Sequence, residues 1–151
     1  MTARPATVHA SAVLVGPRAA LIRGPAGAGK SRLALGLIHA AEGGLIAFAR
    51  LVGDDRIELA ASHGRLLARP APALAGLIEV RGLGIRRLDH EPVAVVGLVV
   101  DLADPGAERL PGAAARDVTV DSVTLPLLAL AAGSDPLPAV LACLLTLRAE
   151  V

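Results

Sequence analysis

The chain has 151 residues, a formal net charge of +1 and one cysteine, Cys143. This length is typical of one domain, so we expect a single catalytic unit over residues 1–151. The balanced charge creates no overall field for nucleic acid or an anionic membrane, and a lone cysteine excludes an internal disulfide. No segment resembles a signal peptide or an uninterrupted membrane span, which indicates a cytoplasmic protein without a membrane partner.

Two short apolar runs, 12–15 and 19–23, open the predicted structure. The turn of Gly16, Pro17 and Arg18 separates them, and its length is typical of a hairpin. We therefore expect the segment that follows to leave the second strand of a hairpin.

That segment has the composition of a phosphate-binding loop. Glycines let the backbone approach a phosphate and adopt positive φ, a lysine contacts the phosphates, and a hydroxyl contacts the associated Mg²⁺. A helix with apolar spacing over 31–41 follows it. An ordinary glycine-rich turn is the alternative, but such a turn needs neither the lysine nor the hydroxyl. The sequence thus predicts ATP and Mg²⁺ as cofactors, bound by Gly24, Pro25, Ala26, Gly27, Ala28, Gly29, Lys30 and Ser31.

The rest of the chain predicts a mixture of strands and short connections. Gly43 and Gly44 should end the first helix, and residues 82–84 should form a flexible element. Residues 102–115 are rich in Pro, Gly and Ala, which predicts an irregular surface segment. Strands are expected at 45–52, 57–61, 65–69, 77–80, 93–100 and 118–120, and a second helix at 135–148.

Phosphoryl transfer also needs carboxylates near the metal and the attacking oxygen. Asp54 and Asp55 follow an apolar strand, Glu79 lies within another, and Asp101 ends the most hydrophobic one. Each also has an ordinary structural interpretation: a turn-forming pair, a solvated strand residue and a helix cap or turn residue. His9, taken alone, is typical of a surface histidine.

Together, His9, the loop at 24–31, the acidic pair in 51–55 and the segment 78–85 resemble the catalytic domain of the HPr kinase/phosphorylases. These bacterial enzymes phosphorylate a serine of the phosphocarrier protein HPr. The segment 78–85, which reads IEVRGLGI, looks like the family signature and is more specific than the loop. The resemblance extends from about His9 to Asp101.

The resemblance implies roles for individual residues. Lys30 would contact the phosphates, and Ser31 and Glu79 would bind Mg²⁺. Asp55 would act as the base toward the acceptor serine with Asp54 near the metal, although the sequence leaves open which aspartate is the base. The remaining implied catalytic residues are His9, beside the aspartates, and Arg81, which would lie near the transferring group or order the loop.

The chain also departs from the family pattern. It resembles a short form without the N-terminal domain, and it carries extra sequence around 40–50 that could displace the acidic pair. The segment 123–131 lacks the arginine that the family uses for the reverse reaction. We therefore expect a kinase that acts on an HPr-type phosphocarrier, and its phosphorylase activity is doubtful.

The expected fold is α/β: a P-loop-containing mixed β-sheet with flanking helices, as in the HPr kinase catalytic domain and the PEP carboxykinase-like fold. An apolar C-terminal helix and the family resemblance also predict a homo-oligomer, with a hexamer as one option. Two alternatives stay open. One is another P-loop kinase in which Asp101 faces the metal, and the other is a nucleotide-binding regulatory module without catalysis.

Overall fold

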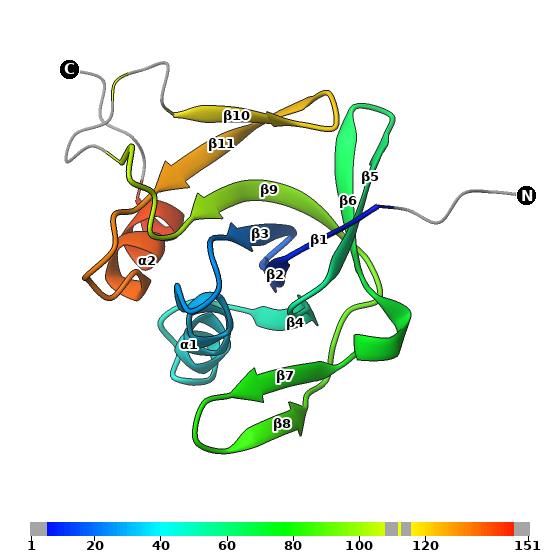
Figure 1. The fold of residues 1–151 in the computed structure, drawn as a ribbon, viewed down its shortest axis with the longest axis vertical. Coiled ribbons are helices and arrows are strands. Elements are labelled where there is room, and N and C mark those ends of the chain that lie inside the picture. Colours follow the sequence, from blue (N-terminus) through cyan, green and yellow to red (C-terminus); the bar gives the residue numbers. More distant parts are fainter. Residues whose placement is uncertain (1–5, 108–111, 113–115, 147–151) are drawn as a thin grey trace, which may run out of the picture.

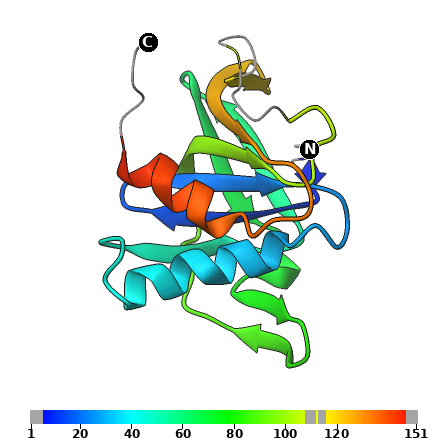
Figure 2. The same cartoon turned by 90° about the vertical axis from the view of Figure 1, so that its left-hand side faces the viewer.

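A curved sheet with both helices on one face organises the chain in a computed structural model that describes residues 6–107, 112 and 116–146 (Figures 1 and 2). The strands are β1 (Thr7–Val8), β2 (Ala10–Val15), β3 (Arg18–Arg23), β4 (Ala49–Gly53), β5 (Ile57–Ser62), β6 (Arg65–Pro70), β7 (Leu77–Val80), β8 (Gly84–Arg87), β9 (Ala94–Asp101), β10 (Asp117–Val120) and β11 (Val123–Ala129). The helices are α1 (Lys30–Glu42), α2 (Leu137–Leu145) and the 3₁₀ turn η1 (Pro72–Leu74).

The main sheet is mixed, with the order β1-β5-β6-β9-β3-β2-β4. β2 and β3 form the predicted antiparallel hairpin, β3 and β11 both run parallel to β9, and β10 pairs with β11. β7 and β8 form a separate two-stranded hairpin next to α1 (Figure 1). The mixed α/β architecture expected from the sequence is therefore confirmed.

Side chains that alternate along the central strands build two cores. Val13 and Ile22 face the helices and pack with Leu33 and Leu37 of α1 and Val140 of α2. Their neighbours on β2 and β3 face the opposite side, where the curled β5, β6, β10 and β11 cover them. This period of two is the ordinary geometry of a strand that is buried on both faces.

Several predicted boundaries were wrong. The strand expected at 45–52 begins only at Ala49, because Gly44 and Leu45 donate backbone hydrogen bonds to Ala41 and Ala40 and so close the end of α1. Residues 43–48 form this capping loop between α1 and β4. The second helix was expected at 135–148 but begins at Leu137. The N–H of Leu137 donates a hydrogen bond to the carboxylate of Asp135. Residues 147–151, and with them its predicted end, lie outside the described residues.

Three strands, β1, β8 and β11, were not predicted. Of residues 82–84, expected to be flexible, Gly82 and Leu83 lie in the turn of the β7–β8 hairpin and Gly84 begins β8. Residues 118–120 are not the last strand, because β11 pairs with both β10 and β9. The irregular segment expected at 102–115 lies partly outside the described residues.

Gly53, the last residue of β4, packs directly against β5 and β6. A Cβ atom at this position would lie 2.7 Å from Ile57 Cδ1 and 3.1 Å from the Pro70 backbone. We expect Gly53→Ala to lower the free energy of unfolding by about 1–3 kcal/mol, since extra volume in a packed core forces side chains and backbone apart. Urea denaturation measures the change.

Gly106→Ala provides the control, because a Cβ atom there meets only Asp104 Oδ1 at 3.4 Å on an exposed turn. Its free energy of unfolding should change by less than about 0.5 kcal/mol. Equal stability of the two variants would contradict the packing argument.

Candidate active site

The loop between β3 and α1 has the geometry of an anion-binding turn. Gly27 has φ +82° and Gly29 has φ +98°, in the region that favours glycine. No side chain caps the N-terminus of α1, which begins at Lys30 as predicted. The first N–H groups of an uncapped helix are free to bind an anion, and the helix dipole favours negative charge there.

Gly24 serves a different purpose from the one expected. It does not adopt positive φ, so the predicted conformational freedom is not used there. Instead, a Cβ atom at Gly24 would lie 3.1 Å from the carbonyl oxygen of Leu102 and 3.3 Å from Cβ of Ala28. The glycine therefore allows the loop to pack closely against the segment that follows β9.

Lys30 and Ser31, on the first turn of α1, point into the loop and toward β4 respectively. The ammonium group of Lys30 donates to the carbonyl oxygens of Gly24 and Pro25, at 2.8 and 3.2 Å. The hydroxyl of Ser31 lies 2.9 and 2.8 Å from the two carboxylate oxygens of Asp54. The predicted phosphate and metal contacts thus lie side by side with one of the predicted aspartates.

Asp54 is held by hydrogen bonds from three elements. Its side chain lies at the end of β4, and the residue is only 4% exposed. Besides Ser31, the hydroxyl of Ser11 on β2 donates to Oδ1, and the backbone N–H of Glu79 on β7 lies 3.4 Å from Oδ2. A buried carboxylate needs such partners, because removing it from water unpaired is costly. Asp54 consequently joins β2, β7 and α1.

Ser11 was not singled out in the sequence. Ser11 and Asp54 are the two buried polar or charged residues in the described part of the chain. A serine within the apolar run of β2 was the available signal, because a fully buried hydroxyl almost always has a hydrogen-bond partner.

Asp55 and His9 form a second, solvent-facing part of the site. Asp55 has φ +68°, and this turn directs its carboxylate away from that of Asp54. His9 lies in the bend between β1 and β2, where its Nδ1 is 3.9 Å from Asp55 Oδ1. The two side chains are 64% and 70% exposed. The acidic pair therefore splits into one buried and one accessible carboxylate.

Glu79 and Arg81 both lie at the surface, and only the backbone of Glu79 is in contact with Asp54 among the described contacts. Glu79 is exposed on β7, and Arg81 is exposed in the turn that follows it. Within the described residues, no cluster of three or more His, Cys, Asp or Glu side chains is arranged as a metal site. Magnesium sites commonly use one or two carboxylates, a hydroxyl, water and substrate phosphates, and Ser31, Asp54 and Glu79 fit that chemistry.

Asp101 occupies a different environment. Its carboxylate accepts two hydrogen bonds from the Arg23 guanidinium, at 2.7 and 2.8 Å. This bond raises the pKa of Arg23 further above its usual value, against the lowering effect of partial burial. Asp101 thus links the ends of β9 and β3, whereas Asp54 is the aspartate that contacts the loop serine.

Comparisons with known proteins agree with this architecture. The family model of the HPr serine kinase C-terminal domain matches residues 1–90, which is more than half of the chain. The HPr kinase/phosphorylase of Bordetella pertussis is 36% identical over 133 residues, covering 80% of this chain and 40% of that protein. The Mycoplasma mycoides protein of the same name is 38% identical over 77 residues, or 51% and 22% of the two chains.

A solved structure is similar over nearly the whole length. The Hpr(Ser) kinase/phosphatase from Coxiella burnetii superposes with a TM-score of 0.72 at 25% identity, covering 92% of this chain and 93% of that one. The chain spans less than half the length of the curated relatives described above. From the matched residues and the shared fold, the chain belongs to the HPr serine kinase C-terminal domain family.

Proposed function

We propose that this chain is an ATP- and Mg²⁺-dependent protein serine kinase whose acceptor is HPr or a related phosphocarrier. The observation that carries the proposal is the contact of Asp54 with Ser31 at the start of an uncapped helix. This contact places a hydroxyl and a carboxylate together beside a loop suited to phosphate. Membership of the family supports the choice of acceptor.

In this proposal, the loop from Gly24 to Ser31 is a P-loop that binds the triphosphate. Its backbone N–H groups and the helix dipole hold the phosphates, and Lys30 exchanges its carbonyl partners for phosphate oxygens. Ser31 and Glu79 would hold Mg²⁺, with Asp54 orienting the Ser31 hydroxyl. When bound, Mg²⁺ neutralises the charge that develops on the phosphate oxygens.

Asp55 is the base in this mechanism. Both oxygens of Asp54 already accept hydrogen bonds from the protein, whereas the exposed carboxylate of Asp55 can approach a hydroxyl on another protein. Asp55 would accept the serine proton as the serine oxygen attacks the terminal phosphorus, while the bond from that phosphorus to the bridging oxygen breaks and ADP leaves. His9 lies beside Asp55 and stabilises its negative charge when protonated, and Arg81 stabilises the transferring group.

The other expected functions have weaker support. A P-loop kinase with Asp101 facing the metal is disfavoured, because that carboxylate is engaged by Arg23. A regulatory module that binds nucleotide without catalysis is separated from the kinase by the experiment below. The segment 123–131 contains no arginine, so we propose phosphorylation, rather than the reverse reaction, as the activity of the chain.

Self-association and location are also proposals. Only Val140 is buried among the residues of α2, and Leu145 is 60% exposed, which supports a homo-oligomer that covers this apolar surface. Within the described residues, no helix is long and apolar enough to cross a bilayer. A cytoplasmic location and the PEP carboxykinase-like relationship stay predictions from the sequence.

The kinase proposal predicts a mass gain of one phosphate on the HPr-type protein of the same genome after incubation with ATP and Mg²⁺. Asp55→Asn should lower turnover by about 10²- to 10⁴-fold, because the serine hydroxyl loses its base, while ATP affinity stays unchanged. Lys30→Ala should lose both transfer and tight ATP binding. Intact-protein mass spectrometry and calorimetric titration measure the two effects.

Asp121→Asn is the matched control, since Asp121 is also exposed with positive φ but lies in the β10–β11 turn. It should behave as the wild type. Absence of transfer by a wild-type protein that binds ATP would favour the regulatory module. Normal turnover by Asp55→Asn would rule out Asp55 as the base.

Ser11 gives a second prediction, because its hydroxyl positions the Asp54 carboxylate. Ser11→Ala should raise the Mg²⁺ concentration needed for half-maximal phosphotransfer, and should lower the free energy of unfolding by about 1–3 kcal/mol. A Mg²⁺ titration of the transfer rate and urea denaturation check both effects. In the control Ser62→Ala, which removes a hydroxyl bonded to exposed His63, neither quantity should change. An unaltered Mg²⁺ requirement in Ser11→Ala would contradict the positioning role.

A further inference from the structure

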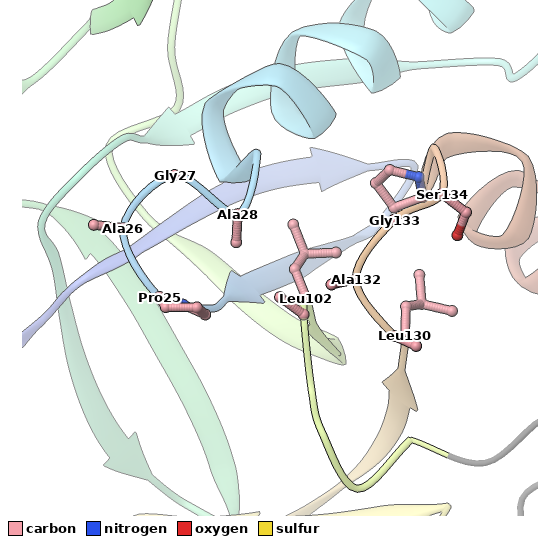
Figure 3. A pocket seen from close by; sticks show the side chains of 12 residues that line it. Pro25, Ala26, Gly27, Ala28, Leu102, Leu130, Ala132, Gly133 and Ser134 are labelled. Atoms are coloured by element: carbon pink, nitrogen blue, oxygen red, sulfur yellow. The ribbon is translucent and has the colours of Figure 1, made fainter.

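A cavity of about 260 Å³ lies beside the loop that we propose binds the phosphates. Three segments line it: residues 25–28 of the loop, residues 102 and 103 after β9, and residues 130–134 and 136 of the connection between β11 and α2. Figure 3 shows Leu102 between Ala28 on one side and Ala132 on the other. The cavity is therefore continuous with the loop but distinct from the side where Ser31 contacts Asp54.

The side chains that line the cavity carry no charge. All of the lining residues are Pro, Ala, Gly or Leu except Ser134, whose hydroxyl can donate or accept a hydrogen bond. Beyond the loop N–H groups, which the proposed function assigns to the phosphates, the cavity offers a further anion no cationic side chain, and burying an unpaired charge is costly. A planar, neutral ring would instead bury its faces against small apolar side chains and use its edge for backbone groups.

The volume of the cavity further limits the kind of ligand that it can hold. Pockets that hold a whole drug-sized ligand usually measure about 300–1,000 Å³, so this one accommodates part of a larger ligand. We propose that it holds the base of the nucleoside triphosphate whose phosphates occupy the loop. This inference rests on the proposed function, and it assigns a role to residues 102–103 and 130–136, which lie beyond the part of the chain matched by the family model.

Backbone hydrogen bonds hold together the two cavity walls that follow β9 and β11. The N–H of Leu130 donates to the carbonyl oxygen of Asp101 at 2.8 Å, and the N–H of Asp104 donates to the carbonyl oxygen of Leu130 at 3.0 Å. The third wall, formed by residues 25–28 of the loop, is held in place by the close packing of Gly24 against Leu102. The cavity is consequently preformed, which lowers the entropic cost of ordering the loops around a base.

The test compares binding of ATP with binding of inorganic tripolyphosphate, which has the phosphates but no base. Ala132→Leu adds apolar volume inside the cavity. We expect it to weaken ATP binding by about tenfold or more, because a displaced base loses its contacts. Tripolyphosphate affinity should stay within about twofold of the wild type. The control Ala142→Leu makes the same substitution on the exposed surface of α2 and should alter neither affinity.

The remaining outcomes would overturn the inference in distinguishable ways. Unchanged ATP affinity in Ala132→Leu would place the base elsewhere while leaving the kinase proposal intact. Equal weakening of ATP and tripolyphosphate would place the effect on the phosphate loop and not on a base. Failure of the wild type to bind either compound would overturn both this inference and the proposed function.

Discussion

The hydrogen bonds between Ser31 and Asp54 are the interaction on which the candidate site depends. They join the first turn of α1 to the end of β4, two elements separated by the capping loop at residues 43–48. Because Asp54 is buried, its carboxylate must be paired, and Ser11 and Ser31 meet this requirement from two sides. The same bonds orient the hydroxyl that the proposed mechanism places at the metal.

The burial of Asp54 explains how two adjacent aspartates can have different roles. The positive φ of Asp55 ends the extended conformation of β4, so the two carboxylates point to different environments. Asp54 is buried and has three protein donors, so the proposed mechanism gives it a structural and metal-orienting role. Exposure leaves Asp55 accessible to a hydroxyl on another protein, as a protein kinase requires.

Local sequence signals predicted the parts of the fold that depend on local chemistry. The β2–β3 hairpin and a helix that starts near Lys30 follow from Gly16 and the Lys30-Ser31 pair, and both were confirmed. β11 was missed because Pro126 interrupts an apolar segment, although Val123 and Leu125 alternate with exposed Thr124 and Pro126. The start of β4 was misplaced because backbone bonds to the end of α1 take precedence over the strand preference of Leu45.

The roles of the site residues also could not be predicted without the three-dimensional structure. The sequence identified Asp54 and Asp55 but gave no means of telling them apart, since their environments depend on β2 and α1. Ser11 is 43 residues from its partner, so no local pattern connects the two. The cavity walls at residues 102–103 and 130–136 likewise meet only through the parallel pairing of β9 with both β3 and β11.

The most direct test of this division of roles is the affinity for ATP with and without Mg²⁺ in Asp54→Asn and Asp55→Asn. The account predicts that Mg²⁺ strengthens ATP binding in the wild type and in Asp55→Asn, and that this effect is lost in Asp54→Asn. A full Mg²⁺ effect in Asp54→Asn, together with its loss in Asp55→Asn, would reverse the assignment and contradict the account.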